Sequence, residues 1–196
     1  MLPLVLASAS PRRADLLRAA GLDPTIAPVE CDERWRAGEA PVAYARRIAR
    51  AKAELAHAAT PPGHVILAAD TTVWIREDEA PLGKPVDADD AAATLQRLAL
   101  ARVHRVTTAF TIVDTRGPSP RWEHGETTTE VEFRALSPAA IAAYVATDEW
   151  RGKAGGYAIQ GHAAALVRGI VGSYTGVVGL PLAEVIERLE ALDAPR

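Results

Sequence analysis

An unbroken apolar run, Val-Ile-Leu-Ala-Ala at residues 65–69, constrains the fold of this chain more than any other feature. A run without polar alternation is typical of a central strand that is buried on both faces of its sheet. Such a strand needs covering layers on each side, which favours a layered fold that contains helices as well as strands. The segment at residues 2–7 is also apolar and predicts a buried first strand.

Helix and strand patterns alternate along the rest of the chain. Residues 41–58 carry apolar side chains near one face and mostly charged ones off it, which predicts an amphipathic helix. Further helices are predicted near residues 11–20, 87–98, 137–145 and 181–192, and further strands near 25–29, 103–114 and 122–133. Residues 73–75 are a candidate extension of the central strand, whereas 172–179 are typical of a loop. This interleaving predicts an α/β or α+β fold, and 196 residues suit one domain or two small lobes with a common core.

Composition and charge narrow the function classes. Hydrophobic residues make up 48% of the chain and the net charge is −3, which argues against disorder and gives no general attraction to nucleic acid or anionic lipid. Cys31 is the only cysteine, so an internal disulfide is impossible and a structural zinc site is not expected. No apolar stretch approaches the roughly 20 residues of a membrane helix, and no basic residue precedes the first apolar run as in a signal peptide. We therefore expect a cytoplasmic protein without membrane contact.

The first candidate site is the segment Ser-Ala-Ser-Pro-Arg-Arg at residues 8–13. A strand ends there and a helix is predicted to begin at Pro11, so that free backbone N–H groups and a partial positive charge face the turn. Ser8 and Ser10 add hydroxyl donors, and Arg12 and Arg13 add guanidinium groups that can bind phosphate oxygens. The alternative is a capped surface helix with two solvated arginines, although basic residues at a helix start are electrostatically unfavourable.

Asp70 follows the central apolar run directly and is the second candidate, with Thr71 next to it. Ligands commonly bind beyond the ends of buried strands in open sheets, and a carboxylate there can hold Mg²⁺ or orient a water molecule. The alternative is a strand-end aspartate that satisfies loop amides.

Three further residues carry weaker signals. Lys84 lies between Gly83 and Pro85, which fix the local backbone and can aim the lysine. Glu33 is a candidate metal ligand, and Lys52, on the helix predicted at residues 41–58, is a candidate for neutralising phosphate charge. Each of the three is equally compatible with a solvated surface side chain.

The glycine-rich segment at residues 153–161 is the last candidate, because it presents Gln160 among three glycines and one aromatic residue. A glutamine amide can pair with the donor and acceptor edge of a nucleobase. The alternative is a glycine-rich turn with a capping glutamine. His162 is interpreted as structural, since no carboxylate or hydroxyl partner is near it in the sequence.

Together these segments resemble the Maf (septum formation inhibitor) family of nucleoside triphosphate pyrophosphatases. The matching motifs occur in the family's order and span nearly the whole chain. They are Leu-Ala-Ser-Ala-Ser-Pro-Arg-Arg at residues 6–13, Asp-Glu at 32–33, Lys-Ala at 52–53, Ala-Asp-Thr at 69–71, Leu-Gly-Lys-Pro at 82–85, Lys-Ala-Gly-Gly-Tyr-Ala-Ile-Gln-Gly at 153–161, Gly-Ser-Tyr at 172–174 and Val-Val-Gly-Leu-Pro-Leu at 177–182. The resemblance implies one domain over residues 1–196, with an elongated, two-lobed α/β fold, a mixed twisted sheet and flanking helices, similar to the inosine triphosphate pyrophosphatases.

The resemblance also implies an activity, the cleavage of a nucleoside triphosphate such as dTTP or UTP to the monophosphate and pyrophosphate with a divalent metal (Mg²⁺, Mn²⁺ or Co²⁺). Asp70 matches the proposed catalytic acid–base residue. Arg12, Thr71 and Gln160 match positions linked to the choice of base. Family members are cytoplasmic and often dimeric, so we expect a homodimer.

The expected mechanism follows from charge. Arg12, Arg13, Lys52 and Lys84 would neutralise the triphosphate, a metal held by Glu33 or Asp70 would add positive charge, and Asp70 would accept a proton from water or hold a metal-bound water. The rival hypothesis is a non-catalytic nucleotide-binding regulator of cell division or stress. It needs the same arginines and glutamine but not the acid. Nucleic-acid binding is not expected, because basic and aromatic residues are not interleaved.

Overall fold

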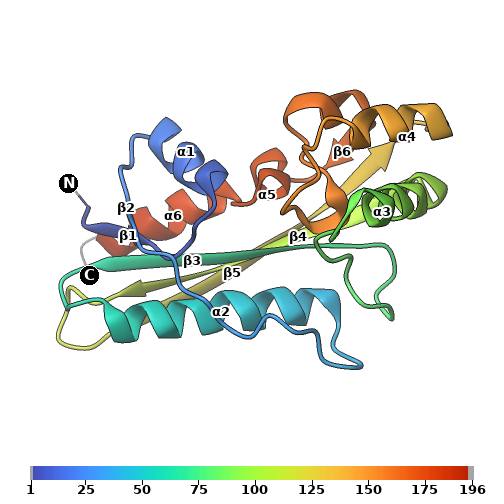
Figure 1. The fold of residues 1–196 in the computed structure, drawn as a ribbon. Coiled ribbons are helices and arrows are strands. Elements are labelled where there is room, and N and C mark those ends of the chain that lie inside the picture. Colours follow the sequence, from blue (N-terminus) through green and yellow to red (C-terminus); the bar gives the residue numbers. More distant parts are fainter. Residues whose placement is uncertain (1, 194–196) are drawn as a thin grey trace.

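The computed structural model describes residues 2–193, and a mixed six-stranded sheet forms the centre of this region (Figure 1). The strands are β1 (Leu4–Leu6), β2 (Thr25–Ile26), β3 (Val65–Trp74), β4 (Val103–Asp114), β5 (Arg121–Phe133) and β6 (Val167–Val171), in the spatial order β2-β1-β3-β4-β5-β6. β1 runs parallel to β2 and β3, whereas β3 to β6 pair in antiparallel fashion. The predicted α/β fold with a mixed sheet is therefore confirmed.

Helices cover both faces of this sheet. They are α1 (Pro11–Ala19), α2 (Pro41–Ala59), α3 (Ala88–Ala101), α4 (Pro138–Val145), α5 (Tyr174–Val178) and α6 (Leu182–Asp193), with the 3₁₀ segments η1 (Ala154–Gly156) and η2 (Gly161–Ala165). In Figure 1, α2 lies along one face of the sheet and the other helices lie on the opposite side. No helix within residues 2–193 is both long and apolar enough to cross a membrane.

Two clusters of buried side chains on the side opposite α2 form the two lobes. α1 and α6 pack over the first half of β3, where Leu17 and Leu67 are buried together. α3 and α4 pack over the second half, where Leu95 is buried against Val73 and Trp150. β3 and β4 contribute side chains to both clusters, so the two lobes have a continuous sheet between them.

β3 is longer than the apolar run that predicts it, which corrects the expected position of Asp70. The strand continues to Trp74 because residues 70–74 pair with β4, where Asp70 lies opposite Ala109. On the other edge, β1 stops at Leu6, which lies opposite Leu67. Asp70 therefore lies in mid-strand beside the stretch of edge that β1 no longer covers, rather than at the end of a strand.

Two other elements were not predicted. Residues 167–171 form β6, where no strand was predicted, and residues 174–178 form the short helix α5 inside the segment 172–179 that was interpreted as a loop. A register irregularity at Glu132 and Phe133 and the glycine at position 169 hide the strand pattern. Ser173 caps α5 by accepting a hydrogen bond from the Gly176 N–H at 3.0 Å, a signal that the surrounding glycines conceal.

Candidate active site

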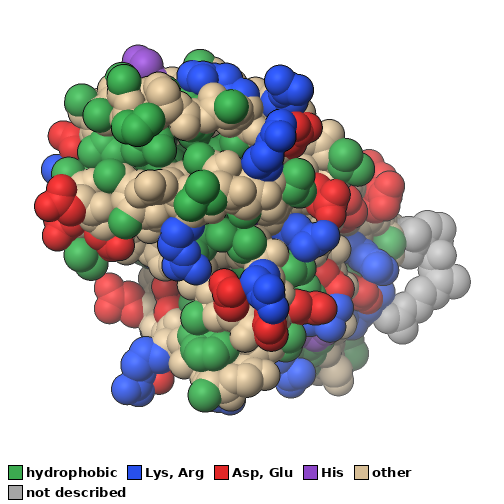
Figure 2. Space-filling view, turned by 90° about the vertical axis from the view of Figure 1, so that its right-hand side faces the viewer, with side chains coloured by type: hydrophobic (Ala, Val, Ile, Leu, Met, Phe, Trp, Pro, Cys, Tyr) green, Lys and Arg blue, Asp and Glu red, His purple; other side chains and the backbone are tan. Residues whose placement is uncertain are grey.

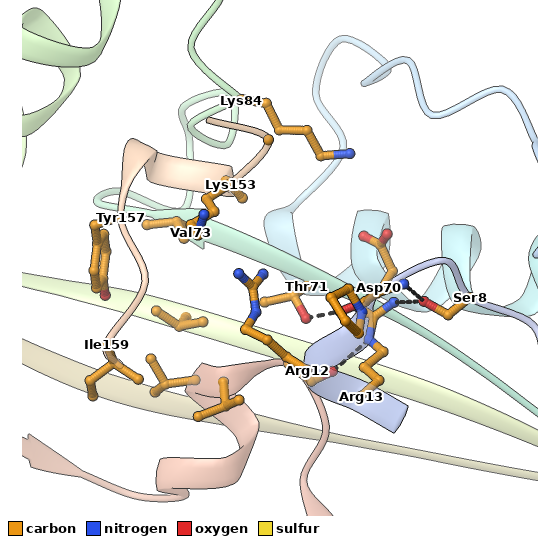
Figure 3. Close-up of a pocket in the computed structure, with 18 of the residues that line it drawn as sticks. Ser8, Arg12, Arg13, Asp70, Thr71, Val73, Lys84, Lys153, Tyr157 and Ile159 are labelled. Carbon is orange, nitrogen blue, oxygen red and sulfur yellow. Dashed lines mark hydrogen bonds between the residues drawn. The ribbon is translucent and has the colours of Figure 1, made fainter. Parts of the chain in front are cut away.

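The candidate site lies where β3 extends past the end of β1. Side chains alternate along a strand, so β3 directs Asp70 toward Lys52 of α2 and Thr71 toward Arg13 of α1, on the opposite face. Because the edge of β3 is open here, both side chains reach the same cavity of about 480 Å³ (Figure 3). Its polar lining comes from Ser8, Ser10, Arg12, Arg13, Asp70, Thr71, Lys84, Arg151, Lys153 and Tyr157.

A buried lysine joins two carboxylates at one end of this cavity. The Nζ atom of Lys52 lies 2.8 Å from Asp70 Oδ1 and 2.6 Å from Glu33 Oε1. Lys84 Nζ approaches the other oxygen of Glu33 at 3.7 Å. This cluster brings together two carboxylates and two cations from four separate segments of the chain.

The protonation states of the cluster follow from burial and from the ion pairs. Burial raises the pKa of Asp70, and the charge of Lys52 opposes that shift. Burial acts to lower the pKa of Lys52, but Asp70 and Glu33 raise it overall. Burial likewise acts to raise the pKa of Glu33, but the hydrogen bond from Lys52 lowers it overall. Lys52 therefore stays charged and favours ionised carboxylates on both sides.

Arg13 is buried and its guanidinium is occupied by the protein. Its Nε donates to the Gly179 carbonyl at 2.8 Å, Nη1 donates to Ser8 Oγ at 2.9 Å and Nη2 donates to Thr71 Oγ1 at 3.1 Å. These bonds tie α1 to β3 and to the turn before α6. Arg13 is thus a fixed positive charge beside Asp70, while most of its hydrogen-bonding capacity holds the site together.

α1 begins at the predicted residue, but the two serines before it make different hydrogen bonds from those expected. Ser10 occupies the N-cap position before Pro11, yet its side chain makes no capping bond. Its backbone N–H instead donates to Ser8 Oγ at 3.2 Å. No acidic residue lies in the first turn of α1, so no carboxylate there counters the positive end of the helix that faces the cavity.

Arg12 and Lys153 both line the cavity, and neither forms an ion pair with a carboxylate of residues 2–193. The Arg12 Nε atom is buried without a hydrogen-bond partner in that range. Among the residues that the structure describes, Lys153 Nζ donates only to the Arg151 carbonyl, at 3.2 Å. Burial lowers the pKa of Arg12, and burial together with the charge of Arg12 lowers the pKa of Lys153.

The other end of the cavity is largely apolar. Its walls are Val73, Val106, Tyr157, Ile159, Val177 and Val178. A hydrogen bond fixes the position of Tyr157, because its hydroxyl lies 2.7 Å from Nε2 of the fully buried His104. Burial lowers the pKa of His104 to about 3, so this histidine is neutral near pH 7.

The structure brings most of the predicted site residues together. Ser8, Ser10, Arg12, Arg13, Asp70, Thr71 and Lys84 line the cavity, and Glu33 and Lys52 join it through Asp70 and Lys84. Gln160 does not line the cavity and its side chain is exposed. Lys153 and Tyr157 were not predicted as site residues, although both belong to the motif that contains Gln160. His162 does have a carboxylate partner, Glu149, whose Oε1 lies 2.7 Å from its Nδ1.

The two carboxylates fit a Mg²⁺-type ion that also binds substrate. Among residues 2–193, no group of three or more His, Cys, Asp or Glu side chains is arranged to hold a metal by itself. Lys52 contacts Glu33 Oε1 and Asp70 Oδ1, and Lys84 Nζ lies 3.7 Å from Glu33 Oε2, so the ion pairs within residues 2–193 engage three of the four carboxylate oxygens, the Lys84 contact being the longest. Mg²⁺ is commonly held by one or two carboxylates, with substrate phosphates and water completing its coordination, so the donor set suits this ion.

Comparison with known proteins identifies the family. Residues 3–192 match the family model described as Maf-like protein. The chain belongs to the Maf family. It is 52% identical to a dTTP/UTP pyrophosphatase of Rhodospirillum rubrum over 93% of this chain and 84% of that protein, and 46% identical to one of Cereibacter sphaeroides over 98% and 96%. Among solved structures, it is similar to a HAM1 protein from Coxiella burnetii, with a TM-score of 0.49 and 21% identity over 98% of both chains.

Proposed function

We propose that this Maf protein hydrolyses dTTP, UTP and modified pyrimidine nucleoside triphosphates to the monophosphate and pyrophosphate. The observation that carries the proposal is the Glu33–Lys52–Asp70 cluster at the edge of a cationic cavity. Two relatives that are 52% and 46% identical have the name dTTP/UTP pyrophosphatase, which supports the choice of substrate. Such an activity would remove unwanted nucleotides before they enter nucleic acid, a house-cleaning role.

Charge explains why this site suits a triphosphate. A triphosphate repels an attacking water until its own charges are neutralised. The open N-terminus of α1 offers backbone N–H groups and a partial positive charge. Lys52, Lys84 and the buried Arg13 add three full positive charges around Asp70. The cavity therefore favours the developing charge on the phosphates and on the leaving group.

In the proposed step, water attacks the α-phosphorus. A new P–O bond forms, and the bond from the α-phosphorus to the oxygen that bridges to the β-phosphorus breaks, leaving its electron pair on pyrophosphate. The proton of the water passes to the Asp70 carboxylate. Burial raises the pKa of Asp70 and makes it a stronger base than a free aspartate, while Lys52 keeps it ionised and oriented.

The metal requirement is part of the proposal. Glu33 would hold a divalent cation, with Asp70 as the second candidate ligand. When bound, Mg²⁺, Mn²⁺ or Co²⁺ would neutralise phosphate charge and polarise the attacked group. Lys52 and Lys84 hold the Glu33 carboxylate in place for this task.

The test is pyrophosphate release from dTTP, UTP, CTP, ATP and a modified pyrimidine triphosphate, each with Mg²⁺, Mn²⁺ or Co²⁺ and with a chelator. We expect the fastest release from the uracil and thymine nucleotides, and none with the chelator. Binding of the same nucleotides without any pyrophosphate release would instead support a non-catalytic regulator. Equal release in the chelator would remove the metal from the proposal.

We further propose a cytoplasmic homodimer that does not bind nucleic acid. The support is the resemblance to the family and the net charge of −3, which gives no general attraction to a polyanion. Light scattering on the purified protein measures the oligomeric state, and a monomer at micromolar concentration would contradict it. Salt-sensitive binding to DNA or RNA would contradict the proposal that the protein does not bind nucleic acid.

A further inference from the structure

The cavity has two ends of different chemistry, which sets the direction of a bound nucleotide. This inference rests on the proposed function. Phosphates suit the end with Asp70, Lys84 and the start of α1. A base, whose ring faces are apolar, suits the opposite end with Tyr157 and Ile159. Figure 3 shows these two ends on opposite sides of Arg12.

The residues predicted to recognise the base do not offer free groups at this end. Gln160 is exposed and lies outside the cavity lining. Thr71 Oγ1 accepts a hydrogen bond from Arg13 and lies 2.8 Å from Thr108 Oγ1. Thr108 donates its own proton to the Gly176 carbonyl, so the proton of Thr71 is directed to Thr108. The polar edge of a base must therefore find other partners.

Arg12 and Lys153 are the side chains with donors to spare. The other cations around the cavity are engaged: Lys52 and Lys84 pair with carboxylates, Arg151 pairs with Asp148, and the Arg13 guanidinium donates to three neutral oxygens. Arg12 and Lys153 form no such pair with residues 2–193, and Arg12 Nε is buried without a partner. A buried donor without an acceptor is costly, so Arg12 is suited to a ligand rich in acceptors. Lys153 can donate to the same ligand, because its bond to the Arg151 carbonyl is exposed.

The groups around Arg12 and Lys153 indicate that these two side chains lie toward the apolar end of the cavity. Tyr144 influences the pKa of Arg12, and Arg12 and Glu149 influence that of Lys153, whereas the carboxylates Asp70 and Glu33, together with Arg12, influence the pKa of Arg13. In Figure 3, the ends of both side chains point into the space between Tyr157 and Asp70. The two positive charges also repel each other, which an acceptor bound between them would relieve.

We propose that Lys153, together with Arg12, recognises the carbonyl oxygens of uracil or thymine and thereby sets the pyrimidine specificity of the enzyme. Uracil and thymine present the acceptor O4 where cytosine presents the donor amino group N4. Lysine and arginine side chains can only donate hydrogen bonds. They stabilise O4 but leave an amino group facing unpaired cationic donors, which penalises cytosine.

The experiment measures binding of UMP and CMP by calorimetry, which needs no turnover. The variants are Lys153→Met, which removes the charge at similar length, Lys153→Gln, whose amide oxygen can accept from N4, and Lys153→Arg, which keeps charged donors. Arg168→Met is the matched control, because Arg168 is 61% exposed on β6 and does not line the cavity. Thermal unfolding of each variant verifies that it is folded.

The wild type is expected to prefer UMP. Lys153→Met should weaken UMP binding about tenfold, the effect of one hydrogen bond from a charged donor, and should not weaken CMP binding, because it removes a donor that opposes the cytosine amino group. Lys153→Gln should shift the preference toward CMP, Lys153→Arg should keep the preference for UMP, and the control should behave like the wild type.

Three results would overturn the proposal. One is an equal loss of UMP and CMP binding in Lys153→Met, together with weaker inhibition by pyrophosphate, because it would place Lys153 on the phosphates. The others are no change in Lys153→Met and a wild type without preference for UMP. If the wild type prefers UMP but releases no pyrophosphate from UTP, the proposed function fails while the base recognition stands.

Discussion

Asp70 is a buried carboxylate with Lys52 at 2.8 Å, and the function proposed for it depends on its charge. Asp70→Asn keeps the size of the side chain and removes both the charge and the base. We expect kcat for UTP to fall about 10²-fold or more, the usual contribution of general base catalysis. The variant should remain folded, because Lys52 keeps its ion pair with Glu33 when the charge of Asp70 is removed. Turnover near the wild-type rate in a folded variant would refute the assignment.

Lys52 sets the pH at which Asp70 becomes ionised. Burial raises the pKa of Asp70, and the charge of Lys52 lowers it. Activity that requires ionised Asp70 is present above this pKa and is lost as the pH falls through it. Lys52→Met should therefore move the acidic limb of the kcat/KM profile to higher pH.

Lys84→Met is the control for this shift, since Lys84 contacts Glu33 rather than Asp70. It should lower the rate without moving the limb. A profile of Lys52→Met that coincides with the wild-type profile after scaling would show that Asp70 is not the group that titrates.

For single residues, the sequence predicted membership of the site more successfully than it predicted the role of each side chain. Ordered motifs placed Ser8, Arg13 and Asp70 in one site, and the structure brings them together. The bond from Arg13 to the Gly179 carbonyl joins residues 166 positions apart, which no local pattern reveals. The exposure of Gln160 depends in the same way on how the loop between η1 and η2 turns.

Among the elements, β3 shows why the sequence predicted a strand but not its end. Residues 65–69 are all apolar because both faces of the sheet are covered there and β1 pairs alongside. Polar residues begin at Asp70, where β1 has ended and one edge is open, although pairing with β4 continues to Trp74. The change from apolar to polar residues thus marks the point where β3 loses one neighbouring strand. In the sequence, this change looks the same as the end of β3 itself.

The segment at residues 152–156 must hold Lys153 against the cavity, and Gly155 fixes it there. The Gly155 N–H donates to the Gly83 carbonyl at 2.9 Å. The φ of Gly155 is +68°, and a Cβ at this position would lie 2.9 Å from Val73 Cγ1. Gly155→Ala is therefore expected to lower the free energy of unfolding by about 1–3 kcal/mol. It should also raise the KM for UTP.

Gly152→Ala separates backbone strain from packing at this position. Gly152 has the same φ of +68°, but its Cβ would meet nothing within 4 Å. Denaturant titration should show a smaller loss of stability for Gly152→Ala than for Gly155→Ala. Equal losses of stability would mean that backbone strain alone, without the contact to Val73, explains why position 155 requires glycine.

The whole molecule joins two lobes through strands that belong to both. β3 contributes Leu67 to the lobe of α1 and α6 and Val73 to the lobe of α3 and α4. β4 contributes Ile112 and Val106 in the same way. The cavity lies beside this junction, so Asp70 and the apolar wall around Tyr157 keep their relative positions only while the strands are intact. A layered fold was predictable from alternating patterns, whereas the division into lobes depends on which helix covers which half of a strand.

This continuity predicts that the two lobes unfold together. Leu17→Ala in the lobe of α1 and Leu95→Ala in the lobe of α3 each remove a fully buried side chain and should each cost about 2–5 kcal/mol. If β3 and β4 couple the lobes, both substitutions lower the temperature of one common transition, and the calorimetric and van't Hoff enthalpies agree. Either variant resolving into two transitions by scanning calorimetry would show that the lobes are separate domains. The prediction distinguishes the cases because a substitution in an independent lobe leaves the transition of the other lobe unmoved.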